Sequence, residues 1–213
     1  MSQDTEHPAI ERAQRTLRQY RAGALDSDGA VTRRRFIIDP SDGALVLELT
    51  PDELTASQSV LHVPDEELPG AADTSLQLLL VLESIDPERE FVCDRFIAAH
   101  NKRSLGAWAR ARIDSARTSD SVIGGDELMI ANPVRTDEGR LLRSLNADRG
   151  ALRAAVLAGA GVDVDEPVAV ACDPYGFDAR GGVGVIRVDF DRRADDADEI
   201  ALFIGTMLEH PPS

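Results

Sequence analysis

The chain has 213 residues, of which 43% are hydrophobic and 29% charged, and its 38 acidic residues outnumber its 23 basic ones. The resulting net charge of −15 repels phosphate backbones and anionic lipid, so neither nucleic acid nor a membrane is an expected partner. No apolar run approaches the roughly 20 residues that span a bilayer. The N-terminus also lacks the basic start and apolar segment of a secretory signal, so we expect a cytoplasmic globular protein.

The first predicted element is an amphipathic helix over residues 8–22. Ile10, Ala13 and Leu17 recur at helical spacing, and Gly23 is suited to end the helix. The longer segment from His7 to Arg35 has seven arginines and only three acidic residues. An anionic ligand is therefore expected to meet this part of the chain.

Strands are predicted to follow. Segments 31–38 and 44–50 are rich in β-branched and apolar residues, and the Asp-Pro-Ser-Asp-Gly sequence at 39–43 between them predicts a hairpin. Residues 51–59 are expected to form a short helix, because acidic side chains favour its first turn. The Pro-, Asp- and Glu-rich segment 63–73 is expected to be a loop.

The segment 75–85 is almost continuously apolar, and we predict a strand because it stands among strands. Segments 90–100, 106–117 and 121–133 are expected to continue the series. Successive strands without intervening helices favour an antiparallel meander or barrel.

The last third of the chain changes pattern after a linker at 133–139. Acidic residues open its final helix, where they complement the helix dipole. The predicted elements are helices over 138–148 and 151–158, strands over 167–172 and 183–190, and a helix over 195–209.

The sequence LLRSLNADRGALRAAV, followed by a spacer and VAVACDPYGFDARGGVGVIRVDF, resembles the C-terminal domain of HugZ-type haem-utilisation proteins. Those proteins are dimeric split barrels of the pyridoxamine-phosphate-oxidase-like superfamily. The resemblance implies an α+β fold, with an antiparallel six-stranded split β-barrel at 1–135, which is FMN-binding-like, and a small α/β domain at 136–213. It also implies a homodimer.

One motif departs from the family. The family helix usually reads His-Met-Asn-x-Asp-His, whereas this chain has Ser144, Leu145, Asn146, Ala147, Asp148 and Arg149. The family's axial haem ligand is a histidine near the C-terminal end, and His210 is the candidate in a comparable place. The four histidines of the chain share no close spacing, so we expect no structural metal.

The resemblance also implies where a cofactor would bind, because the superfamily uses basic groups on adjoining strands to hold a phosphate. The basic groups on predicted strands include Arg33, Arg34, Arg35 and Arg110, and an arginine fork can bind phosphate or carboxylate. Trp108, the lone indole, could cover a ring. The alternative for these residues is a structural role in the core or on a solvated strand face.

Three functions stay open from sequence. The first is a HugZ-like protein that binds haem or a related tetrapyrrole, a small planar anionic ligand, in a dimer cleft; if catalytic, it would be a haem-degrading oxygenase. The second is an FMN-dependent oxidoreductase that uses the same arginines. The third is a non-catalytic regulatory or protein-binding relative, favoured by the missing histidines and by the 4% aromatic content.

Overall fold

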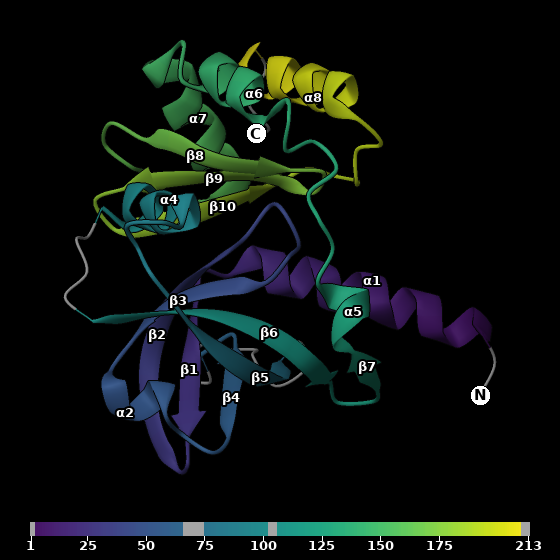
Figure 1. Cartoon of the computed structure of the whole chain (residues 1–213). Helices are drawn as coiled ribbons and strands as arrows, with labels where there is room; N and C mark the ends of the chain where they lie inside the picture. Colours follow the sequence, from purple (N-terminus) through teal and green to yellow (C-terminus); the bar gives the residue numbers. More distant parts are fainter. Residues whose placement is uncertain (1–2, 66–74, 102–105, 210–213) are drawn as a thin grey trace. The chain divides into compact units, whose positions relative to one another are not determined.

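The computed structural model describes residues 3–65, 75–101 and 106–209, with side chains from residue 8 onward. The chain folds into two compact units (Figure 1). The first comprises Met1–Ile97 and Lys102–Ala131, and the second comprises Ala98–Asn101 and Asn132–Ser213. Each unit has a hydrophobic core of its own.

The first unit is a closed antiparallel barrel of six strands with one added strand. The strand order is β3-β2-β1-β4-β5-β6, and pairing of β3 with β6 closes the barrel. The added strand, β7, pairs with the end of β6. The fold is therefore α+β with a split-barrel body, as predicted. The strands are β1 (Ala22–Ser27), β2 (Ala30–Ile38), β3 (Leu45–Leu49), β4 (Ser59–Val63), β5 (Leu76–Ile85), β6 (Ala107–Arg117) and β7 (Val122–Gly124).

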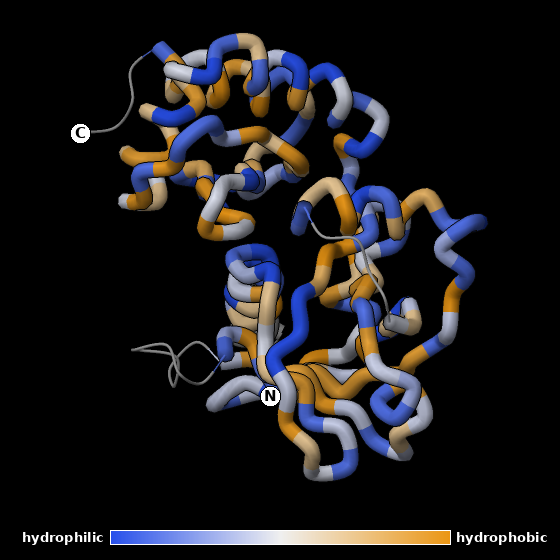
Figure 2. Tube along the Cα trace, turned by 90° about the vertical axis from the view of Figure 1, so that its left-hand side faces the viewer, coloured by the Kyte–Doolittle hydropathy of each residue, from blue (hydrophilic) through white to orange (hydrophobic). Residues whose placement is uncertain are grey.

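Alternating side chains fill the barrel. Leu25 of β1, Phe36 of β2 and Leu61 of β4 are completely buried, and they belong to the same core cluster. In Figure 2, orange segments gather where the strands of the barrel lie. Because side chains of a strand point alternately to its two faces, the neighbours of these residues lie on the outside of the barrel.

The hairpin predicted at 39–43 joins β2 to β3, and it depends on a glycine. Gly43 has φ +82°, a conformation that side chains rarely adopt. A Cβ atom there would also lie 2.4 Å from the backbone nitrogen of Ile130. The turn thus requires glycine for both its conformation and its close packing.

Four helices accompany the barrel strands within the described part of the chain, and some of them differ from prediction. Helix α1 ends before the predicted position, because β1 begins at Ala22 and includes Gly23. The predicted helix 51–59 is limited to one turn, since β4 begins at Ser59. The helices are α1 (Gln3–Gln19), α2 (Pro51–Leu54), α4 (Phe91–His100) and α5 (Gly125–Leu128).

The prediction of a strand at 90–100 was wrong, because this segment forms α4. Its buried apolar residues Val92, Phe96 and Ala99 are three or four positions apart, which is helical spacing. The strand predicted at 121–133 is also shorter, because β7 ends at Gly124 and α5 begins at the next residue.

The second unit packs helices against a three-stranded antiparallel sheet of order β10-β9-β8. Helix α6 contacts β8, α7 contacts β10, and α8 contacts both of these helices. The middle strand lies between the two segments predicted as strands, 167–172 and 183–190, and it was not predicted. The elements are α6 (Glu138–Leu145), α7 (Arg149–Ala160), β8 (Val168–Asp173), β9 (Gly176–Gly181), β10 (Gly184–Asp189) and α8 (Ala197–Glu209).

The Leu-Asn-x-Asp motif of this unit has a structural role. The Asn146 amide nitrogen donates to the carbonyls of Leu142 and Ala169, and its oxygen accepts from the Ala169 N–H at 2.9 Å. Asp148 caps α7 by accepting from the Ala151 N–H at 3.0 Å. Asn146 therefore joins the end of α6 to β8, and Asp148 begins the next helix.

The two aspartates of the Asp-Pro-x-Gly-Phe-Asp motif, Asp173 and Asp178, belong to a buried ion-pair cluster. The Arg187 guanidinium lies 2.7 Å from Asp173, 3.4 Å from Asp178 and 3.0 Å from Asp189, and its side chain is only 4% exposed. The backbones of β9 and β10 also approach closely, since a Cβ at Gly176 would meet the Val188 carbonyl at 2.1 Å. Both motifs thus specify the fold of this unit.

Across the described ranges, no helix is both long enough and apolar enough to cross a membrane.

Candidate functional site

The outer face of the barrel carries a row of five residues on five neighbouring strands, and all but one of them are polar or basic. Antiparallel pairing places each of these residues opposite the next, so their side chains project to the same face. We call them the basic row, which consists of Arg33, Ala24, His62, Gln77 and Arg117 on β2, β1, β4, β5 and β6 in that order.

The burial of neighbouring residues shows that this row faces outward. Leu25 and Leu61, which pair one position away from Ala24 and His62, are fully buried inside the barrel. Arg33 and Arg117 are exposed, whereas His62 is half-buried. His62 is the middle member, and each arginine is two strands away, or roughly 10 Å for strands about 4.8 Å apart.

An apolar row runs beside the basic row, two residues further along each strand. It includes Val31, Val60 and Leu79, with Asp26 between the first two. Val31 is 64% exposed, and Val60 and Leu79 are half-buried. Two residues of a strand span about 6.6 Å, so an apolar strip and a cationic strip lie side by side.

Arg33 retains most of its exposure despite a nearby acid. Its Nε lies 3.4 Å from Asp65, and its side chain is 71% exposed. Exposed ion pairs of this kind are weak, so a ligand anion can compete for the guanidinium. Arg35 projects from the same face of β2 and is also exposed.

Arg34, although it lies between these two arginines in sequence, points the other way. Its Nε and Nη2 donate to Oε1 of Glu53 at 2.9 and 2.7 Å. The same oxygen accepts from the Thr32 hydroxyl at 2.6 Å. Glu53 is buried, so this arginine neutralises a carboxylate within the barrel unit.

Arg110 is also paired. Its Nη2 lies 2.5 Å from Asp39 and its Nη1 lies 2.7 Å from Asp42, and both acids belong to the β2–β3 turn. Burial opposes the charge, but the two carboxylates outweigh it and raise the pKa of Arg110. The arginine fork therefore fastens the hairpin turn to β6.

Trp108 packs within the barrel unit. Its side chain is 6% exposed, and its ring meets that of Phe96 at 5.0 Å with an interplanar angle of 85°. This edge-to-face contact is a common core arrangement. The structure therefore brings Arg33 and Arg35 to one open face, but it places Arg34, Arg110 and Trp108 in other environments.

Of the histidines, His210 lies outside the described residues. Sequence reasoning did not single out His62, because β4 was not predicted and the segment after it was expected to be a loop. The sequence Val60-Leu61-His62-Val63 was the available signal for this strand. In a strand, the side chain of His62 points to the face away from that of the buried Leu61.

The two cysteines are buried thiols. Both are 1% exposed. Burial, with help from Glu90, raises the pKa of Cys93 to about 11, and burial also raises that of Cys172. Protonated thiols are poor metal ligands and poor nucleophiles.

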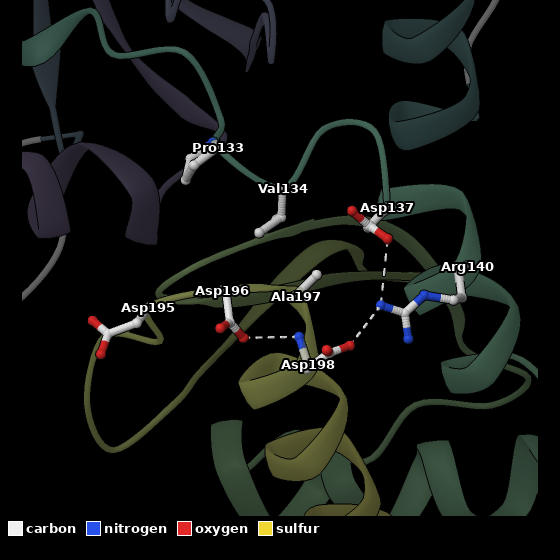
Figure 3. Close-up of a pocket in the computed structure, with 8 residues that line it drawn as sticks. All are labelled: Pro133, Val134, Asp137, Arg140, Asp195, Asp196, Ala197 and Asp198. Atoms are coloured by element: carbon white, nitrogen blue, oxygen red, sulfur yellow. Dashed lines mark hydrogen bonds and ion pairs between the residues drawn. The ribbon is translucent and has the colours of Figure 1, made fainter.

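A cavity of about 310 Å³ lies in the second unit, between the starts of α6 and α8 (Figure 3). Its Arg140 is held by Asp137 at 3.4 Å and Asp198 at 3.3 Å. Asp196 caps α8 by accepting from the N–H groups of Asp198 and Glu199. With Asp195 also in its wall, the cavity is acidic and repels an anionic ligand. Within the described residues, no three His, Cys, Asp or Glu side chains are grouped to hold a metal ion.

Comparisons with known proteins support the fold. No family model and no curated protein matches the sequence. The structure is similar to that of the protein Atu2129 from Agrobacterium tumefaciens, whose function is unknown, with a TM-score of 0.71 and 20% identity over 95% of this chain and 96% of that one. A heme binding protein from Mycobacterium smegmatis is matched with a TM-score of 0.44 and 19% identity over 94% of this chain and 96% of that chain.

Proposed function

We propose that this chain is a divergent HugZ-type split-barrel protein that binds haem, or a related tetrapyrrole, on the outer face of its barrel without catalysing a reaction. The observation that carries the proposal is the apolar row beside the basic row. A tetrapyrrole combines a flat apolar ring with anionic propionates, and the two rows present the matching chemistry side by side.

The residues of this face fit haem in both respects. Val31, Val60 and Leu79 offer apolar contact to a ring, and Arg33 and Arg117 offer guanidinium groups to carboxylates. Bound haem would supply an iron atom that takes an axial ligand and a ring that absorbs visible light. The chain would bind the ring, orient it and neutralise its charge.

The same face supports the proposal of a homodimer. Val31, Val81 and Val122 lie on strands at or beside the two rows and are 64%, 54% and 75% exposed. A second copy packed against this face would remove these side chains and one face of a bound ring from water. Light scattering coupled to size-exclusion chromatography tests the dimer, and a monomer at micromolar concentration would contradict it.

Hemin titration of the purified protein tests the proposed ligand. We expect a Soret shift at micromolar hemin, corresponding to a binding free energy of about −8 kcal/mol. Combined replacement of Arg33 and Arg117 by Ala should weaken binding at least about tenfold, because each arginine can contribute a charge-assisted hydrogen bond. Arg112→Ala is the matched control, since Arg112 is exposed on β6 but lies outside the basic row.

The outcomes separate the candidate functions. Binding that is weakened by the double variant, and is unchanged by the control, supports a tetrapyrrole on this face. A flavin spectrum in the purified protein would instead favour the FMN-dependent oxidoreductase. Absence of binding for both hemin and FMN at micromolar concentration would overturn the proposal and leave the protein-binding relative.

A further inference from the structure

We infer that Met129 is an oxidation-sensitive site: its thioether closes an interruption in the strand pairing of the barrel, and its sulfoxide opens it. The oxidant is hydrogen peroxide or a related small peroxide. The inference does not depend on the proposed ligand, since it rests only on contacts within the barrel unit.

The interruption lies along the edge of β6 that faces away from β5. On this edge β3 pairs with β6 up to Ala111, and β7 pairs with it from Ser115 onward. Ile113 falls between the two pairings, next to the bulge in the pairing of β6 with β5. Within the described residues its backbone therefore has no strand partner on this edge, although backbone groups in a barrel wall need one.

Helix α5 and Met129, the residue that follows it, fill the interruption. The N–H of Ile113 donates to the Sδ atom of Met129 at 3.2 Å. Gly125, at the start of the same helix, packs so closely that a Cβ atom there would collide with the Ile113 carbonyl oxygen. The helix lies against both β6 and β7 (Figure 1). A thioether sulfur thus takes the place of a strand carbonyl, although sulfur is only a weak acceptor.

Two further elements are fastened at the same place. The Gln14 side chain of α1 donates to the carbonyl of Glu127 at 2.7 Å. Gly43 of the β2–β3 turn packs against the backbone of Met129 and Ile130, where a Cβ atom would collide. Because the packing is this close, a displacement of Met129 reaches α1, the hairpin turn and β6 together.

Oxidation of the sulfur forces such a displacement. Met129 is half-buried, so a small oxidant can reach it. The sulfur attacks one oxygen of hydrogen peroxide: an S–O bond forms, the O–O bond breaks, and the other oxygen leaves as water. The sulfur loses two electrons and the peroxide gains them.

The resulting sulfoxide does not fit the present geometry. An N–H···O bond to the new oxygen needs about 2.9 Å between nitrogen and oxygen. The sulfur therefore has to move outward from its 3.2 Å contact with the Ile113 nitrogen. The sulfoxide also places a polar group on a side chain that packs against the barrel core.

Peroxide treatment of the full-length protein tests the inference. Peptide mass spectrometry measures the sulfoxide at Met129 and at Met207 separately. We expect oxidation of Met129 to accelerate amide exchange at Ile113 about tenfold or more, because the N–H loses its acceptor. The unfolding equilibrium constant in urea should rise at least about fivefold. Methionine sulfoxide reductase should reverse both changes, since it restores the thioether.

Two variants separate Met129 from the other oxidisable groups. Met129→Leu keeps an apolar side chain of similar size but forms no sulfoxide, so peroxide should leave its Ile113 exchange and its stability unchanged. Met207→Leu is the matched control, because Met207 is also half-buried but packs in the second unit. This control should respond to peroxide as the wild type does.

Each result decides the assignment. If Met129 is fully oxidised and both exchange and stability stay unchanged, the assignment is overturned. It is also overturned if Met207 is oxidised in the folded protein while Met129 is not, or if treated Met129→Leu loses as much stability as the wild type. If Met129→Leu does not fold, the oxidised wild type compared before and after reductase treatment gives the same decision without a substitution.

Discussion

Glu53 holds Arg34 by two hydrogen bonds to a single carboxylate oxygen, at 2.9 Å from Nε and 2.7 Å from Nη2. The other oxygen of Glu53 accepts from the N–H of Thr50 at 2.7 Å and so secures the start of α2. One buried carboxylate thereby connects β2 to the short helix that follows β3. Arg34 is therefore held by a buried carboxylate, whereas its sequence neighbours Arg33 and Arg35 are exposed.

Removal of this carboxylate should destabilise the barrel unit. Glu53→Ala leaves the half-buried Arg34 guanidinium without its anion and the Thr50 N–H without its acceptor, so we expect a loss of about 2 kcal/mol. Urea unfolding measures the change. Asp52→Ala is the matched control on the same helix, and because Asp52 is exposed its effect should stay within about 0.5 kcal/mol. Equal effects of the two variants would contradict the structural role of Glu53.

The contribution of Glu53 should also depend on pH. Burial alone would raise its pKa, but hydrogen bonds from Thr32, Thr50 and Arg34 outweigh burial and hold the pKa below its usual value. A carboxyl whose pKa is lowered by folding adds stability above its unfolded pKa of about 4.3, and that stability is lost as the pH falls through the folded value.

Glu53→Gln isolates this dependence, because the amide has nearly the same shape but does not titrate in this range. We expect the wild type to be more stable than the variant near neutral pH, and the difference to shrink as the pH falls below about 4.3. Urea unfolding of both proteins at stepped pH values measures it. A difference that stays constant, or grows, toward acid pH would be inconsistent with ionised Glu53 as the source.

The case of Arg34 shows how far the sequence could predict the site. The sequence identified Arg33, Arg34 and Arg35 as one basic segment on a strand, and alternation implies that the middle arginine faces away from the other two. Which face lies inside depends on closure of the barrel between β3 and β6, a long-range pairing that local pattern does not reveal.

The fold was more predictable than the site for a related reason. A turn such as Asp-Pro-Ser-Asp-Gly is determined by a few consecutive residues. The structure confirms the hairpin that this turn predicted between β2 and β3. The helix α4 was misassigned because its neighbours are strands, although Val92, Phe96 and Ala99 follow helical spacing. His62 was missed because its strand has only five residues and stands next to a polar segment.

The thiols should be slow to react in the native protein. With the pKa of Cys93 raised to about 11 by burial, the thiolate fraction at pH 8 is about one in a thousand, and the raised pKa of Cys172 makes its fraction small as well. We expect a disulfide reagent such as DTNB to titrate both cysteines rapidly in urea but only slowly without it. Rapid reaction of one equivalent with the native protein would show an accessible, activated cysteine and would contradict this environment.

Asn146 offers the sharpest test of the second unit. Asn146→Ala removes the hydrogen bonds that pair both the N–H and the carbonyl of Ala169 with the end of α6, at 2.9 and 3.0 Å. We expect a loss of about 2 to 3 kcal/mol, because two backbone groups of β8 lose their partner. Asp148→Ala, which removes a single helix cap two residues away, should cost only about 1 kcal/mol. Urea unfolding ranks the two variants, and amide exchange at Ala169 locates the change. If Asp148→Ala proved the more damaging, the motif would act mainly by starting α7, and the connection of α6 to β8 would contribute little.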